Sequence, residues 1–138
     1  MTLRELLYGI LRTDAQSAVA GSLGTLLAHT TVSPYGVYFM NPPKEPVFPL
    51  LTYYFGAEVD WIPRVMTLNI VAWSADDLYD ELLKRTYTLL HHKEVNLIAA
   101  TDFDIKKIEW NWDSPDMYDE EFKVYLRQQR YLIYGMKV

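Results

Sequence analysis

The sequence predicts a single α+β domain in which amphipathic helices pack on one face of a mostly antiparallel β-sheet. The stretch RVMTLNIVAWSADD, Arg64 to Asp77, alternates apolar and other residues and then changes to a helical period after Ser74. Two further runs, near residues 3–11 and 78–90, place leucines at helical spacing. The chain has 138 residues and half of them are hydrophobic. We therefore expect residues 1–138 to share one core and form one domain.

Composition excludes several classes of protein. The chain has no cysteine, so disulfides, thiolate catalysis and cysteine-ligated zinc are ruled out. A net charge of -5 argues against a dedicated binder of nucleic-acid phosphates, although a local basic surface lining a ring is compatible with it. No apolar run approaches the ~20 residues that span a bilayer, and the N-terminus lacks a signal-peptide pattern. We expect a cytosolic protein with no membrane partner.

The N-terminal segment predicts a capped helix. Thr2 and Glu5 have the spacing of a capping box, and helical spacing is shared by Leu3, Leu6, Leu7, Ile10 and Leu11. A second short helical turn is expected over residues 14–20, because Thr13 and Gln16 could cap it.

Prolines punctuate the next segment. Five of them, at positions 34, 42, 43, 46 and 49, bracket one short predicted strand, Val37 to Met40. The segment NPPKEP, residues 41–46, is expected to form a stiff loop at a sheet edge, since proline cannot donate to a ladder. Pro43 and Lys44 are candidate partner contacts there, although a plain connector between strands is the favoured interpretation.

A β-hairpin is predicted next. Leu50 to Ala57 is a strand rich in aromatic residues, and residues 58–63 turn the chain into the strand that begins at Arg64. Trp61 and Ile62 would lie at the hairpin tip, where large apolar groups are less expected than in a core.

The clearest predicted helix follows this hairpin. Ser74 and Asp77 are expected at its N-cap and third position. Its mostly apolar residues lie along one side of the helix: Leu78, Tyr79, Leu82, Leu83, Thr86, Leu89 and Leu90. The helix should therefore fold back over its own sheet.

The C-terminal part predicts two strands. In residues 103–112 large apolar side chains occupy every second position, but the pattern shifts by one residue near Lys106 and Lys107, which indicates a β-bulge there. Ser114 to Asp116 should end the strand. In residues 118–135 some large side chains recur at helical spacing, whereas others alternate as in a strand. A long strand is the favoured interpretation, because aromatic residues are dense in this segment.

Candidate chemistry is sparse. His91 and His92 are adjacent on a helix and point about 100° apart, so one ion is hard for them to share, and His29 has no identifiable partner. The chain has no nucleophile elbow, phosphate-binding loop or dinucleotide fingerprint. We predict no enzyme and no catalytic, cofactor-binding or metal-ligating residues.

One acidic group admits three interpretations. It comprises Asp113, Asp116, Asp119, Glu120 and Glu121. A solvated turn is favoured over a divalent-cation site, because the regular spacing and glycine of a calcium loop are missing. The same residues could also face a basic patch on a neighbouring subunit.

Aromatic residues are the informative feature, because they are enriched where proteins bury surface against one another. Trp73 ends a buried strand and is expected in the core. An intersubunit contact and an intradomain core are equally compatible with the other tryptophans. The possible interface residues are Trp61, Ile62, Pro43, Lys44, Trp110 and Trp112.

The order of these elements resembles a known family. The pieces are a leading helix, a strand, FPLLTYYF, IPRVMTLNIVAWSADDLYDELLKR and YDEEFKVYLRQQRYLIYG. Together they are similar to the tail-terminator or tail-completion proteins of long-tailed bacteriophages, the minor tail protein U family. The likeness covers residues 48–135 and includes the junction of Trp73 and Ser74. The stretch through Leu27, Ala28 and His29 and the NPPKEP loop depart from it.

The resemblance implies a structural virion protein of the tail or neck, assembled in the host cytoplasm. Such proteins form a hexameric ring that caps the tail tube and joins it to the head connector, with DNA only passing through the central channel. The implied partners are copies of itself, the tail tube protein and the head-tail connector protein, with no cofactor. Two alternatives stay open: another connector component such as a head-completion or stopper protein, and a small-ligand or enzymatic α+β domain.

Overall fold

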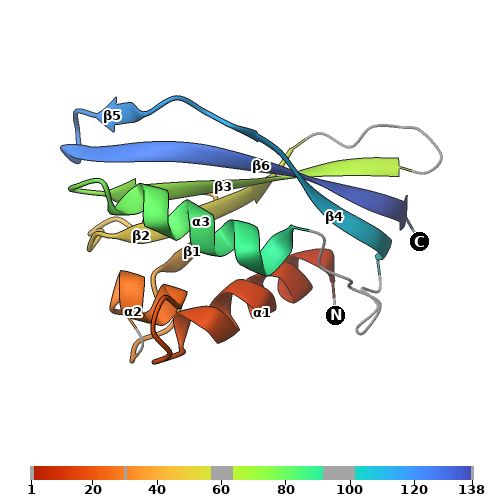
Figure 1. Ribbon diagram of the computed structural model, residues 1–138, viewed down its shortest axis with the longest axis horizontal. Helices are drawn as coiled ribbons and strands as arrows, with labels where there is room; N and C mark the ends of the chain where they lie inside the picture. Colours follow the sequence, from red (N-terminus) through yellow and green to blue (C-terminus); the bar gives the residue numbers. More distant parts are fainter. Residues whose placement is uncertain (1, 30, 57–63, 92–101, 138) are drawn as a thin grey trace.

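The computed structural model describes residues 2–29, 31–56, 64–91 and 102–137, and it confirms the predicted α+β class (Figure 1). Its strands are β1 (Val37–Phe39), β2 (Leu50–Phe55), β3 (Arg64–Ser74), β4 (Phe103–Asp113), β5 (Met117–Asp119) and β6 (Val124–Lys137). They form one sheet in the order β1-β2-β3-β6-β4, and β5 pairs with β6 beyond the end of β4. Only the pairing of β1 with β2 is parallel among these described strands.

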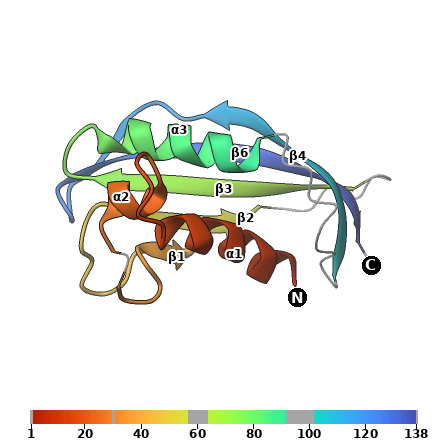
Figure 2. The same cartoon turned by 60° about the horizontal axis from the view of Figure 1, so that its bottom comes forward.

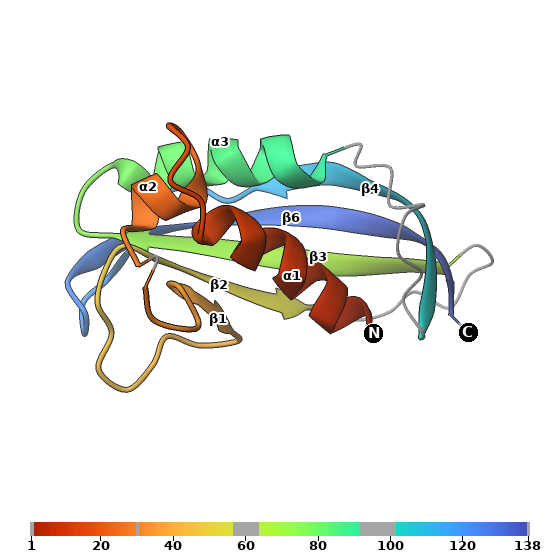
Figure 3. The same cartoon turned by 90° about the horizontal axis from the view of Figure 1, so that it is seen from below.

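Three helices cover one face of this sheet: α1 (Leu3–Ala15), α2 (Leu23–Leu27) and α3 (Leu78–Leu90). Figures 2 and 3 show all three on the same side. The α1 helix contacts β1, and α3 contacts β3, β6 and β4, so the two long helices serve opposite halves of the sheet. Leu68, Ile70 and Ala72 alternate along β3 and bury their side chains beneath these helices, as the sequence period predicts. No described helix has both the length and the hydropathy needed to cross a bilayer.

The capping box at the start of α1 is confirmed. The Glu5 amide donates to Thr2 Oγ1 at 3.2 Å, and the Thr2 amide donates to Glu5 Oε2 at 3.4 Å. Two amides that the first turn leaves without helical partners are thereby satisfied.

Replacing Thr2 with alanine should lower the free energy of unfolding by about 1 kcal/mol, because the Glu5 amide loses its acceptor. Urea unfolding followed by circular dichroism measures this. An unchanged midpoint would show that water replaces the cap at no cost.

The prediction of a short helix over residues 14–20 is wrong. The α1 helix continues to Ala15, and Gln16 is its C-cap. The next helix begins at Leu23 with Ser22 as its N-cap. The Asp14 carboxylate accepts a hydrogen bond from the Leu23 amide at 2.8 Å. This tertiary bond, together with the Ser22 cap, places α2 later in the chain than local signals suggest.

The helix after β3 also begins later than predicted. Ser74 is the last residue of β3, where it pairs with Tyr125 of β6, so it cannot serve as the N-cap. Asp77 takes that position without a side-chain bond, and the Asp76 carboxylate accepts from the Leu78 amide at 3.0 Å instead. The predicted apolar stripe and the return of the helix over its own sheet are both confirmed.

The long strand predicted over residues 118–135 is confirmed only from residue 124, because residues 118–119 belong to β5 and residues 120–123 form a turn. Residues 124–137 form the long central strand β6, which pairs with β3 on one side and with β4 on the other. The register between β4 and β6 shifts between Ile105 and Lys107, where the sequence predicts a bulge, and shifts again between Trp110 and Trp112. The break at residues 114–116 separates β4 from β5.

Candidate functional site

Exposed aromatic residues gather at the β4 side of the sheet. Tyr87 of α3 is 41% exposed, and Trp110 and Trp112 of β4 are 40% and 41% exposed. Tyr118 of β5 and Tyr125 of β6 are exposed as well, and they pair across the two strands with ring centroids 5.1 Å apart. Large apolar groups that remain in solvent within a well-packed domain are typical of surfaces that contact another protein.

A groove runs between α3 and β4, and we call it the α3–β4 groove. It has a volume of about 500 Å³ and is lined by Asp80, Leu83, Lys84, Tyr87, Thr88, Trp110, Asp113 and Gln129. The α3 residues recur at intervals of three and four, so one stripe of this helix forms a whole wall. The groove therefore has aromatic walls and carboxylates at one end.

Hydrogen bonds and ring contacts hold the aromatic wall in place. The Trp110 indole Nε1 donates to Asp113 Oδ1 at 2.9 Å, and the Trp110 amide donates to His91 Nδ1, also at 2.9 Å. The His91 ring stacks on Tyr87 with centroids 4.5 Å apart, and Tyr87 meets Trp110 edge to face at 6.4 Å. Rings fixed before binding lose little entropy when a partner covers them, which is the property of an interface anchor.

The acidic group predicted from sequence is divided among separate contacts. Asp113 bonds to Trp110, and Asp116 accepts from the Arg127 guanidinium at 2.8 Å. The Arg127 hydrogen bonds hold the pKa of Asp116 below its ordinary 3.8. Across the described ranges, no three acidic or histidine residues come together as a metal site would require. The arrangement is that of a charged rim rather than a chelating cluster.

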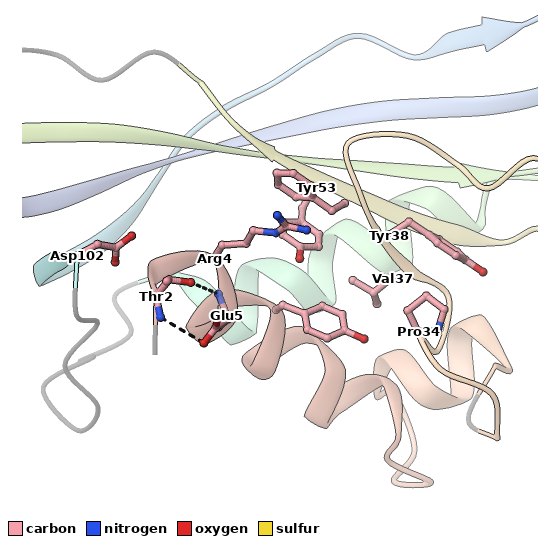
Figure 4. A pocket seen from close by; sticks show the side chains of 10 residues that line it. Thr2, Arg4, Glu5, Pro34, Val37, Tyr38, Tyr53 and Asp102 are labelled. Atoms are coloured by element: carbon pink, nitrogen blue, oxygen red, sulfur yellow. Dashed lines mark hydrogen bonds between the residues drawn. The ribbon is translucent and has the colours of Figure 1, made fainter.

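A second hollow lies at the opposite edge of the sheet, between α1 and β1 (Figure 4). Its volume is about 760 Å³, and Arg4 lies across the ring of Phe39 at 3.7 Å. Burial raises the pKa of Tyr53, whose ring stacks on Tyr8. Thr2 and Glu5 bond to each other, as the dashed lines show. Thr2 and Glu5 are thus engaged in the helix cap, and Arg4 is packed against Phe39.

The structure separates the candidate interface residues. Trp110 lies on the helix-covered side of β4, whereas Trp112 lies under Arg130, whose guanidinium is 5.0 Å from the ring centre. Pro43 and Lys44 lie in the loop between β1 and β2, half-buried and exposed respectively, far from β4 in the strand order. Trp61 and Ile62 lie outside the described residues, as does His92. Whether any of them contacts a partner stays a prediction.

Two other sequence expectations need correction. His29 has a partner, because its Nε2 lies 3.1 Å from the Pro49 carbonyl oxygen. Trp73 is only half-buried; its Nε1 donates to Thr52 Oγ1 at 2.9 Å on the face without helices, where Phe122 packs edge to face against it. A tryptophan on the face without helices cannot reach the main core, which lies beneath the helices.

Sequence reasoning missed Tyr87 as part of the site. The available signal was its position outside the apolar stripe of α3, since an aromatic residue on the polar side of a helix needs something else to cover it. The groove itself could not be foreseen, because its second wall comes from β4, some 20 residues further along the chain.

No protein-family model matches the chain, and no curated protein matches it. Solved structures do match: ten chains resemble this fold. One belongs to a structure titled "Virion of native gene transfer agent (GTA) particle". It is 12% identical with a TM-score of 0.65, and the match covers 96% of this chain and 95% of that chain. The protein therefore belongs, by fold, to the class of small α+β domains that this virion chain also represents. The two folds can be superposed over nearly the full length of both chains.

Proposed function

We propose that this protein is a structural virion protein, a ring-forming tail terminator at the head-tail junction of a long-tailed bacteriophage. The observation that carries the proposal is the end-to-end fold likeness to a chain of a gene transfer agent virion. The match covers 96% of this chain and 95% of that chain, so the likeness extends over all the elements that the proposal uses. The sequence resemblance to the minor tail protein U family supports the finer role.

The surface supports an assembling role. Fixed aromatic rings stand at the β4 edge, and a different edge, formed by β1 and α1, lies across the sheet. Two unlike surfaces on one subunit allow a head-to-tail contact, which closes into a ring when the rotation between copies permits. A stable contact of this kind buries on the order of 1,000 Å² or more.

In this role the protein would contact three kinds of partner: copies of itself, the tail tube protein and the head-tail connector protein. DNA would pass through the central channel without specific binding, and the protein would act without catalysis or a cofactor. The predicted contacts at Trp61, Ile62, Pro43, Lys44, Trp110 and Trp112 remain part of the proposal.

The test is the shape and mass of the purified protein. We expect negative-stain micrographs to show rings, and light scattering to give six times the 16.1 kDa of one chain. Purified tails should also contain the protein at one end. A strictly monomeric protein at high concentration that is absent from purified tails would contradict the proposal.

Location separates the alternative role of a head-completion or stopper protein. A gold-labelled copy should appear at the end of tails purified from a mutant that makes no heads. Label found only on tailless, DNA-filled heads would favour the alternative.

A further inference from the structure

We infer that neighbouring copies join by inserting the proline-rich loop between β1 and β2 of one copy into the α3–β4 groove of the next. The loop is the NPPKEP segment, residues 41–46. The inference deepens the proposed function, because it rests on a head-to-tail assembly and names the two surfaces that form it.

The loop presents apolar surface that its own subunit leaves uncovered. Met40 and Val47 flank the loop and are 56% and 64% exposed. Between them lie three prolines and the exposed Lys44. The loop projects from the sheet beside β1 (Figure 3). Large apolar groups at both ends of a projecting loop are typical of a segment that another protein covers.

The backbone of the loop is fixed before any partner binds. Met40 has a φ of 69°, in the left-handed region that a residue with a side chain seldom adopts unless its surroundings hold it there. Its amide donates to the Tyr53 carbonyl oxygen at 2.8 Å, and the Asn41 amide donates to the Phe39 carbonyl oxygen at 2.9 Å. The prolines restrict φ further along the loop. A loop with a fixed backbone loses little conformational entropy when it docks.

The α3–β4 groove offers rings that suit both prolines and a cation. Tyr87 and Trp110 lie edge to face with centroids 6.4 Å apart, and they are 41% and 40% exposed. Grooves lined by aromatic residues recognise proline-rich segments in several kinds of binding module. An ammonium group near the same rings is attracted by their π-electrons.

One carboxylate of the groove has no cation beside it. Asp80 is already paired with cations, among them Lys84 at 3.2 Å. Asp113 accepts from the Trp110 indole Nε1 at 2.9 Å, and no ion pair involves Asp113 or Lys44 in the described part of the chain. The Lys44 ammonium and the Asp113 carboxylate are therefore complementary groups that each subunit leaves unpaired.

Charge sets the orientation of the loop rather than the strength of the contact. The loop as a whole is neutral, because Glu45 follows Lys44. Long-range attraction to the groove is therefore small, and the apolar contacts of the prolines and the rings supply most of the affinity. The pair of Lys44 with Asp113 determines which way the loop enters the groove.

A subunit cannot fill its own groove. The loop lies beside β1 at one edge of the sheet, and the second wall of the groove is β4 at the other edge. Four strand spacings of about 4.8 Å place these edges about 19 Å apart. The loop can therefore reach only the groove of a second copy. Each added copy leaves one loop and one groove free, so assembly continues until a ring closes.

Cross-linking of mixed chains tests the inference, since the chain has no cysteine of its own. Glu45→Cys places a thiol in the loop, and Thr88→Cys places one on the lining of the groove. We expect a short bismaleimide to give a covalent dimer when the two chains are mixed, and little product from either chain alone. The matched control replaces Thr88→Cys with Lys107→Cys, which lies against Tyr134 on the face without helices, and should give little product.

Charge reversal is the second measurement. Lys44→Glu should weaken association roughly tenfold in analytical ultracentrifugation, because it sets two carboxylates against each other. Lys123→Glu, in the exposed turn between β5 and β6, changes the net charge equally and should leave association unchanged. Asp113→Lys alone should also weaken association, and combining it with Lys44→Glu should recover most of the loss.

The outcomes separate the two proposals. Rings that form without the 45–88 product, or that tolerate Lys44→Glu, would overturn this inference and leave the proposed function standing. Equal product from one single-cysteine chain alone would show a symmetric contact and overturn the inference as well. A 45–88 product in open filaments, with no rings and no protein in tails, would support the contact and overturn the tail-terminator role. A monomeric protein with no product would overturn both.

Discussion

Replacing Asp14 with asparagine is expected to lower the free energy of unfolding by about 2–3 kcal/mol. Asp14 is 9% exposed, and its carboxylate accepts from Arg85 Nε at 2.8 Å, from Arg85 Nη2 at 2.6 Å and from the Leu23 amide. One carboxylate thus ties α1, α2 and α3 together. Removing one partner of a buried ion pair typically costs 3–5 kcal/mol, and we expect less because the Arg85 side chain is 30% exposed.

The same pair predicts how stability depends on pH. Burial alone would raise the pKa of Asp14, but the Arg85 and Leu23 hydrogen bonds outweigh burial and hold it below its ordinary 3.8. A carboxyl whose pKa is lower in the folded state stabilises the fold above its unfolded pKa. This stabilisation is lost as the pH falls through the folded pKa. Wild-type protein should therefore lose stability more steeply than Asp14→Asn below about pH 4.

Equilibrium urea unfolding at pH 7 and at pH 3 measures both effects. Arg85→Met is the partner variant, and the double variant should cost less than the sum of the single ones, because neither partner then remains buried alone. Strict additivity would contradict a direct pair. A stability difference between wild type and Asp14→Asn that stays constant down to pH 3 would contradict the pKa assignment.

The Asp14–Arg85 pair also illustrates what a sequence can and cannot predict. The helical stripes of α1 and α3 depend on periodicity alone, so both helices were predictable within a few residues. The position of α2 depends on a bond from Leu23 to a carboxylate nine residues earlier, and the end of β3 depends on its pairing with Tyr125. Both boundaries were therefore predicted wrongly, since tertiary contacts override local caps.

For the candidate interface too, only the features that depend on local sequence could be predicted. The aromatic excess is visible in the composition, but the sequence left a contact and a core position equally open for Trp110, which the structure shows to be partly exposed. The groove could not be predicted, because its walls come from α3 and β4, which are separated in the sequence.

Gly135→Ala is expected to cost about 3 kcal/mol or more, although the same substitution at Gly9 of α1, where an added Cβ would meet no atom within 4 Å, should stabilise the chain. Gly135 is buried in β6, opposite Arg64 of β3 and Ile105 of β4, at the point where the β4 register shifts. A Cβ there would lie 2.1 Å from the Asp104 carbonyl oxygen and 2.7 Å from Phe103 Cε1. Such distances are far inside contact, and the nearer atom is backbone, so a side chain cannot simply rotate away.

The start of β4 would therefore have to leave β6, and buried Phe103 would have to leave the core. Urea unfolding of the two alanine variants side by side checks the contrast, since the chemical change is identical and only the surroundings differ. A loss below about 1 kcal/mol at Gly135 would show that β4 yields easily at its bulge. If the loss is large, Gly135→Ala should also weaken assembly, because the strand displaced from β6 is the one that carries Trp110 and forms the second wall of the groove.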